Sequence, residues 1–167
     1  AAVRQTKDRP GVTYIRCPRK DCIKVYGEKT EFVLGKANVL REGTDCAVIA
    51  CGIMVAEALE AAKQLEAEGI QIAVIDPVTI KPLDKETVLK YAKQCGAVVT
   101  AENANVIGGL GSAVCEALSE ECPTIVKRVG VQDLYGEVGN VDYLKERFGL
   151  TAENIVKAVK EAISAKK

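Results

Sequence analysis

Histidine and tryptophan are absent from the 167-residue sequence, and aromatic residues make up only 4% of it. Without histidine, the chain cannot supply an imidazole acid or base, a Ser-His-Asp or Cys-His pair, or a His-ligated metal site. Charge of one sign is also lacking, because Lys plus Arg and Asp plus Glu each number 23 and the formal net charge is zero. This balance argues against nucleic acid or an anionic membrane as a partner, since both attract clustered excess cation.

Long hydrophobic runs are missing as well. No apolar stretch approaches the roughly 20 residues that span a bilayer. The first residues, AAVRQTKDRPG, have neither the apolar core of a signal peptide nor an initiator Met. We therefore expect a cytoplasmic protein with no membrane partner, in a chain that is either processed or cut out of something longer.

Seven cysteines are present, which is an odd number, and no two of them have the spacing CxxC. Cys46 and Cys51 lie in the apolar segment CAVIAC, where cysteine commonly packs as a small hydrophobic side chain. We expect free, buried thiols and a reducing compartment. Disulfides, or a metal site made of cysteines alone, are the alternative.

From residue 45 onward, apolar runs of strand length alternate with segments of helical periodicity. The predicted strands cover residues 45–51, 71–76, 96–100 and 124–129. The predicted helices cover residues 53–68, 84–94 and 112–120, and a last one begins after Thr151. Near-continuous apolar strands between helices indicate an α/β fold: a doubly wound, mainly parallel sheet with helices on both faces.

The opening residues do not follow this repeat. A helix end within residues 1–9 and a strand over residues 12–17 are predicted there, followed by a polar break at 18–21. A further strand is predicted over residues 32–40, with a bend at Gly35. One helix end and one strand cannot bury an apolar face of their own. We therefore interpret the opening piece as the end of a preceding domain, joined by a linker at about residues 20–31.

A glycine-rich segment, Gly108-Gly-Leu-Gly-Ser112, lies between a predicted strand and a predicted helix. It is a weak match to a dinucleotide fingerprint, because Val114 stands where Gly or Ala is needed and the segment follows the third predicted strand. The N–H groups at Gly108, Gly109 and Gly111 nevertheless suit an anion at the start of the helix. The alternative is that these glycines allow close packing and unusual backbone angles.

Three carboxylates stand near predicted strand ends. Glu102 lies just past a strand end, at the edge where open α/β sheets bind ligands. Its alternative role is that of a solvated or helix-capping carboxylate. Asp76 and Asp84 are predicted to be a turn residue and a helix N-cap.

Three cations, Arg16, Arg19 and Lys20, follow the first predicted strand. A guanidinium group just beyond a strand end suits bidentate binding of phosphate. Side chains alternate along a strand, so Arg16 and Arg19 need not converge, and plain surface charge is the alternative.

Ordered motifs extend over nearly the whole chain. They include Phe32-x-x-Gly-Lys-Ala-x-Val-Leu-Arg-Glu-Gly-x-Asp45, Ala50-x-Gly-x-Met-Val-x-Glu-Ala-Leu59, Ile80-Lys-Pro-Leu-Asp84, Thr100-Ala-Glu102, Gly108-Gly-Leu-Gly-Ser-Ala-Val114, Arg128-Val-Gly-Val-x-Asp133 and Phe148-Gly-Leu-Thr151. Together they resemble the C-terminal domain of transketolase, in a family of thiamine diphosphate enzymes. Within it the chain is most similar to the C-terminal subunit of split transketolases. The family of 1-deoxyxylulose-5-phosphate synthase is a near relative, and the pyruvate dehydrogenase E1 β subunit a distant one.

The resemblance implies a domain organisation. Residues 1–20 would be the end of the pyrimidine-binding domain, residues 21–32 a linker, and residues 33–167 the transketolase C-terminal domain. In the family, Pro-Gly-x-x-Tyr-Ile-Arg-x-x-Arg ends with the arginine that binds the phosphate of the sugar substrate, which is Arg19 here. Pro18 precedes it, as in the synthase, whereas transketolases often have Ser there. Ala104 stands where family members often carry His.

The resemblance also implies the activity of a parent enzyme, which moves a two-carbon ketol unit from a ketose phosphate to an aldose phosphate, as in the pentose phosphate pathway. Thiamine diphosphate and Mg²⁺ support this chemistry in the whole enzyme. The family's Gly-Asp-Gly motif for them is absent, and the glutamate that activates the cofactor would precede residue 1. We therefore expect no cofactor, no metal and no catalytic residue on this chain, and no ketol transfer by it alone. The expected partners are an N-terminal transketolase part or subunit, a second copy in a homodimer, and a sugar phosphate.

Three other interpretations stay open. The chain is the C-terminal part of 1-deoxyxylulose-5-phosphate synthase, or a stand-alone regulatory module that binds an anion or nucleotide at Gly108–Gly111. It is otherwise an assembly scaffold with an apolar patch near residues 1–17, where a missing domain docks. The module predicts binding that Gly109→Val abolishes, and the scaffold predicts dimers in solution.

Overall fold

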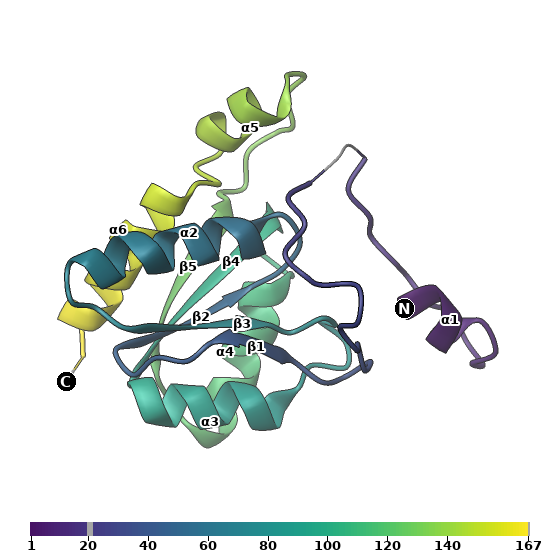
Figure 1. Ribbon diagram of the computed structural model, residues 1–167, viewed down its shortest axis with the longest axis horizontal. Helices are drawn as coiled ribbons and strands as arrows, with labels where there is room; N and C mark the ends of the chain where they lie inside the picture. The colour runs from purple at the N-terminus through teal and green to yellow at the C-terminus, as the bar shows by residue number, and fades with distance from the viewer. Residues whose placement is uncertain (20–21, 167) are drawn as a thin grey trace.

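The computed structural model describes residues 1–19 and 22–166, and a five-stranded sheet lies at its centre (Figure 1). The strands, in the order in which they lie side by side, are β1 (Asn38–Arg41), β3 (Ile72–Asp76), β2 (Cys46–Ala50), β4 (Ala97–Asn105) and β5 (Ile125–Val131). β2 runs parallel to β3 and β4, and β4 runs parallel to β5, whereas the edge strand β1 is antiparallel to β3. The predicted, mainly parallel sheet is therefore confirmed, with one antiparallel strand at its edge.

Helices cover both faces of this sheet (Figure 1). α2 (Met54–Ala67) and α6 (Ala152–Ser164) pack together on one face, and α3 (Lys85–Cys95) and α4 (Leu110–Glu121) on the other. Two short helices, α1 (Ala2–Thr6) and α5 (Val141–Arg147), bury no residue and lie outside these layers. This layering confirms the doubly wound α/β arrangement. None of the helices in the described ranges is long and apolar enough to cross a membrane.

Two apolar clusters, one on each face, enclose the sheet. Along β2, Cys46, Val48 and Ala50 belong to the cluster that α2 and α6 complete. Ala47 and Ile49 belong to the cluster that α3 and α4 complete. All five side chains are inaccessible to solvent. β2 is apolar without alternation because a central parallel strand is covered on both faces.

Identifiable caps begin two of the predicted helices. Asp84 accepts hydrogen bonds from the Thr87 N–H (3.3 Å) at the start of α3 and from the Ala37 N–H (2.9 Å). Burial of Asp84 opposes its ionisation, but these hydrogen bonds outweigh burial and lower the pKa of the carboxyl group. Thr151 begins α6 by accepting a hydrogen bond from the Asn154 N–H (3.4 Å). The predicted roles of Asp84 and Thr151 are confirmed.

The structure corrects several predicted elements. Residues 12–17 form no strand, because no strand in the described part of the chain lies beside them as a hydrogen-bonding partner. Residues 32–37 are irregular, so only the end of the strand predicted over 32–40 pairs with the sheet. The strand predicted over residues 96–100 is longer than expected, because residues 101–105 extend β4 and Asn105 pairs with Val131 of β5. Helix α5 has no counterpart among the predicted helices.

All seven cysteines are free, as expected, but they are not all buried. Cys46, Cys51, Cys95, Cys115 and Cys122 are buried or partly buried in the body of the domain. Cys17 and Cys22 are exposed, so the expectation of buried thiols is wrong for these two, which lie outside the packed layers. Burial raises the pKa of the Cys46 and Cys51 thiols to about 12, which keeps them protonated at neutral pH.

Candidate functional site

The carboxyl ends of the parallel strands form the edge at which a sheet of this kind binds ligands. The chain passes from β2 through α2 to β3 on one side, and β4 later takes its place on the other side of β2. The strand order therefore changes direction between β2 and β4. Cys51 and Gly52 follow the end of β2 at this point, and Glu102 and Asn103 lie on β4 just beyond its last pair with β2.

The N-terminal segment reaches this point from outside the sheet (Figure 1). The Arg16 guanidinium donates a hydrogen bond from Nη2 to the Asn103 carbonyl oxygen (2.8 Å), although the two residues are 87 positions apart. Asn103 also lies against Gly52, where a Cβ atom would come within 2.8 Å of Asn103 Oδ1. Three distant parts of the sequence thus meet at the place where the strand order changes direction.

A hollow of about 630 Å³ opens beside this meeting point. The N-terminal segment, the start of α2 and helix α5 line it. The lining residues are Arg19, Cys22, Ile23, Val25, Gly52, Ile53, Ala56, Glu57, Val141, Asp142 and Lys145. The predicted phosphate-binding arginine therefore borders a largely apolar hollow.

The charged groups in the hollow balance one another. Glu57 accepts hydrogen bonds from Lys145 Nζ and from the Ala152 N–H (3.0 Å), which fixes α5 and the start of α6 beside α2. Arg19 and Asp142 are the other two charged residues of the lining. Within residues 1–19 and 22–166, no hydrogen bond or ion pair joins the Arg19 side chain to another residue. The Arg19 side chain is exposed beside the hollow.

The glycine-rich segment surrounds a buried carboxylate. Glu102 is only 1% exposed, and it accepts hydrogen bonds from the Leu110 N–H (2.9 Å) and the Gly111 N–H (2.8 Å) at the start of α4. A Cβ atom on Gly109 would lie 2.0 Å from Glu102 Oε2, and one on Gly111 would lie 2.8 Å from Arg128 Cδ. These two glycines therefore permit close packing. The helix-capping interpretation of Glu102 is confirmed, and the solvated one is wrong.

This capping arrangement bears on the anion site expected at Gly108, Gly109 and Gly111. Two N–H groups at the start of α4 already bind the Glu102 carboxylate, and the Gly108 N–H donates to Ser112 Oγ (2.8 Å). None of the three glycines lines the hollow beside Arg19. External anion binding at this segment stays a prediction. In the structure, the Glu102 carboxylate occupies the position that an external anion would take.

Asp76, at the carboxyl end of β3, anchors the segment that leads into the domain. It accepts a hydrogen bond from the Val78 N–H (2.9 Å), as a turn residue does, and another from the Tyr26 hydroxyl (2.5 Å). Burial and this second contact raise the pKa of Tyr26. The Tyr26 ring also packs edge-to-face on Phe32, with centroids 4.7 Å apart. The turn prediction for Asp76 is confirmed, and the contact with Tyr26 adds a role that the sequence did not suggest.

Comparison with protein families identifies the domain. Residues 35–155 match the family model described as Transketolase, C-terminal domain, which is well over half of the chain. The chain belongs to the transketolase C-terminal domain family.

Individual transketolases extend the likeness beyond this domain. The 6-deoxy-6-sulfo-D-fructose transketolase subunit of Clostridium sp. (strain MSTE9) is 54% identical over 166 residues, which are 99% of this chain and 52% of that subunit. A solved structure described as a split gene transketolase, inactive beta4 tetramer, has 47% sequence identity and a TM-score of 0.96, and the match covers 100% of this chain and 55% of that one. The chain thus spans about half the length of these transketolases.

A synthase is also related to this transketolase domain. The 1-deoxy-D-xylulose-5-phosphate synthase of Heliobacterium modesticaldum (strain ATCC 51547 / Ice1) is 39% identical over 166 residues, which are 98% of this chain and 26% of the synthase. The predicted likeness to both enzymes is therefore confirmed, with the higher identity on the transketolase side.

Sequence reasoning missed two long-range contacts beside the hollow. One is the hydrogen bond between Arg16 and Asn103, and the other is the interaction of Lys145 with Glu57. Neither has a signal in the sequence, because the residues are 87 and 88 positions apart and no periodicity links them. The contact of Glu102 with Gly111 spans only nine positions, and a carboxylate shortly before a glycine-rich helix start is a usable signal for it.

Proposed function

We propose that this chain is the C-terminal part of a split-transketolase subunit whose complete enzyme moves a two-carbon ketol unit from a ketose phosphate to an aldose phosphate. The observation that carries the proposal is the extent of the likeness to a transketolase subunit, 54% identity over 99% of the chain. This likeness includes residues outside the family-model match, which begins at residue 35, and so takes in the segment with Arg19. A stand-alone binding module has no reason to share that segment.

In this proposal, Arg19 binds the anionic end of the sugar. Its guanidinium is exposed beside an apolar hollow, and a guanidinium group forms two parallel hydrogen bonds with the oxygens of a phosphate or sulfonate. The other charged residues of the lining are Lys145, which is paired with Glu57, and Asp142, so any second cation for the anion comes from the rest of the enzyme. The role of this chain in the reaction is to bind and orient the substrate, and to support the subunit that activates the substrate.

The residues of this chain do not fit thiamine diphosphate or the divalent ion that bridges its phosphates. Across residues 1–19 and 22–166, no three His, Cys, Asp or Glu side chains are grouped so that they would hold a metal ion. The start of α4, which suits a diphosphate by its N–H groups, holds the carboxylate of Glu102, and like charge repels the ligand. We place the cofactor on the rest of the enzyme and assign this chain no step through it.

A reconstitution assay tests the proposal. The full-length subunit alone, supplied with thiamine diphosphate, Mg²⁺, a ketose phosphate and an aldose phosphate, is expected to show no ketol transfer, and addition of the partner subunit is expected to restore it. Arg19→Ala in the complete enzyme should raise KM for the donor roughly 10- to 100-fold, as expected for a lost charged hydrogen bond. Ketol transfer by residues 1–167 alone would contradict the proposal, and formation of 1-deoxyxylulose 5-phosphate from pyruvate would favour the synthase.

One observation favours a sulfonated sugar as the donor. The relative at 54% identity is a 6-deoxy-6-sulfo-D-fructose transketolase subunit, whereas the synthase is 39% identical. A sulfonate carries one charge at all relevant pH values, while a phosphate ester gains its second charge near pH 6. With a sulfosugar as natural donor, kcat/KM for 6-deoxy-6-sulfofructose should exceed that for fructose 6-phosphate and should not change around pH 6. A higher kcat/KM for the phosphate would reject this candidate.

A further inference from the structure

Few hydrogen bonds hold the segment that carries Arg19 to the domain before the anchor at Tyr26. In the described part of the chain, residues 10–19 and 22–25 make no hydrogen bond between backbone groups. The single hydrogen bond that joins these residues to the body of the domain is the one from Arg16 Nη2 to the Asn103 carbonyl oxygen (2.8 Å). Further along the chain, Val25 packs against the core and Tyr26 binds Asp76. Among the described residues, the Arg16 contact is the hydrogen bond to the body that lies nearest to Arg19 in the sequence, three positions before it.

The acceptor of this hydrogen bond is itself rigidly placed. Asn103 follows Glu102, whose buried carboxylate is fixed by two N–H groups at the start of α4. The Asn103 side chain lies against Gly52, which is one of the residues that line the hollow with Arg19. The hydrogen bond to the Asn103 carbonyl thus joins the segment to the edge of the sheet beside which the hollow opens.

We infer that Arg16 is a positioning residue for Arg19: its hydrogen bond to Asn103 keeps the segment in place so that the Arg19 guanidinium borders the hollow. The inference rests on the proposed role of Arg19 in binding the anionic end of the sugar. Arg16 uses one of its N–H groups for the hydrogen bond to a backbone carbonyl. Its planar, weakly hydrated guanidinium suits this contact better than an ammonium group does. Loss of the contact should weaken anion binding without changing the chemical step.

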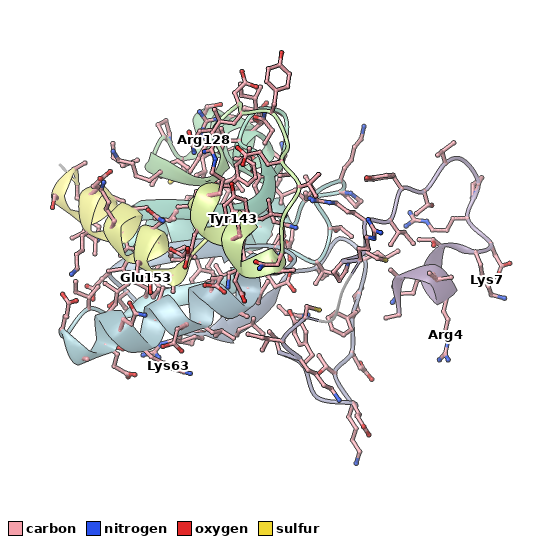
Figure 2. The ribbon with its side chains drawn as sticks, turned by 90° about the horizontal axis from the view of Figure 1, so that it is seen from above. Arg4, Lys7, Lys63, Arg128, Tyr143 and Glu153 are labelled. Carbon is pink, nitrogen blue, oxygen red and sulfur yellow. The ribbon has the colours of Figure 1, made fainter. Side chains whose placement is uncertain are left out.

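The test uses the complete enzyme, assembled from the full-length subunit and its partner. KM and kcat are measured with fructose 6-phosphate, and inorganic phosphate serves as a competitive inhibitor whose Ki reports binding of the anion alone. Arg4→Ala is the matched control, because Arg4 lies on α1 in the same N-terminal piece and points away from the body of the domain (Figure 2).

Arg16→Ala is expected to raise both KM and the Ki of phosphate roughly three- to tenfold, the range for one hydrogen bond at an exposed position, with kcat within a factor of two. Arg16→Lys should recover part of this loss, since its Nζ can donate to the same carbonyl oxygen. Arg19→Ala should raise both constants more than Arg16→Ala does, and Arg4→Ala should leave them unchanged. Arg16→Gln gives the same test should the alanine variant fail to assemble.

Two results separate failure of this inference from failure of the proposed function. If Arg19→Ala raises KM and Ki while Arg16→Ala behaves like Arg4→Ala, the positioning role is overturned and the role of Arg19 stands. If Arg19→Ala leaves both constants unchanged, the role of Arg19 falls and the positioning role falls with it. A loss of kcat at constant KM and Ki in Arg16→Ala indicates a general structural role and also overturns the inference.

Discussion

The body of the domain buries its apolar side chains, whereas the segments beyond the carboxyl edge of its sheet leave large apolar side chains exposed. Every side chain of β2 is inaccessible to solvent, whereas Val12 is 100% exposed and Tyr135 is 97% exposed. Figure 1 shows the N-terminal segment and α5 extending away from the packed layers. The body is therefore stabilised by its apolar packing, while the outer segments keep their shape through a few polar contacts.

Those polar contacts can be named. Glu137 accepts hydrogen bonds from the Tyr143 hydroxyl (2.7 Å) and from Arg147 Nε (2.7 Å), which links the loop before α5 to the helix. The hydrogen bond from the Tyr143 hydroxyl lowers the pKa of the Glu137 carboxyl group, and the charge of Arg147 lowers it further. Asn105 Nδ2 donates to Asp133 Oδ1 (2.9 Å) where this loop leaves β5. The outer segments are thus organised without a core of their own.

The largest effect on stability is expected inside the body, at Gly109. In Gly109→Ala, the added Cβ atom would lie 2.0 Å from Glu102 Oε2, so the buried carboxylate must leave the N–H groups that it binds. We expect a loss of about 3 kcal/mol in the free energy of unfolding, measured by urea denaturation of the purified chain.

Gly27→Ala is the matched control outside the body. Its Cβ atom would meet nothing closer than Thr30 Oγ1 at 3.9 Å, so the change in the free energy of unfolding should stay within about 0.5 kcal/mol. Equal unfolding midpoints for the two variants would contradict this difference in packing between the body and the outer segments.

A smaller effect, with a pH dependence, is expected at Asp84. The folded state holds the pKa of Asp84 below its ordinary value of 3.8, so the carboxylate stabilises the fold above that pH and loses this effect as the pH falls through the folded-state pKa. Asp84→Ala should cost about 1–2 kcal/mol at pH 7 by loss of the N-cap, and less below pH 4. Urea denaturation between pH 7 and pH 3 measures this.

The control for Asp84 is Glu121→Gln, at the exposed end of α4. It should leave the free energy of unfolding within about 0.5 kcal/mol of the unmodified chain at pH 7. An Asp84→Ala variant with the same stability deficit at pH 3 as at pH 7 would contradict the assigned role of the carboxylate.

The smallest effect is expected in the loop before α5. Replacement of Tyr135 and Val138 together by serine removes two large side chains, yet both are fully or almost fully exposed, so the free energy of unfolding should change by less than about 0.5 kcal/mol. Ile49→Val, which removes one methylene from β2, should cost about 1 kcal/mol. A larger loss in the loop variant than in Ile49→Val would show that the loop contributes to the core after all.

The elements of the body could be predicted from the sequence because local signals determine them. β2 is a short apolar run, α2 has apolar residues at three-and-four spacing, and Asp84 and Thr151 begin their helices as N-caps. The outer elements could not be predicted in this way. Residues 12–17 are rich in β-branched and aromatic side chains but have no neighbouring strand in the described residues. Helix α5 has seven residues and buries none of them.

The candidate site shows the same limit. Arg19 could be proposed as a site residue from its motif. The contact of Glu102 with Gly111 could be predicted because only nine positions separate the two residues. The contact of Arg16 with Asn103 depends on the path of an irregular segment across the sheet edge, which no local pattern determines. Contacts between residues close in the sequence can therefore be predicted from this sequence, and contacts between distant residues cannot.

Isothermal titration calorimetry of residues 1–167 with thiamine diphosphate and Mg²⁺ tests whether the coenzyme binds to the rest of the enzyme, as we propose. We expect no saturable heat from this chain alone, and binding once the complete subunits are mixed. Tight, saturable binding by the isolated chain would contradict it.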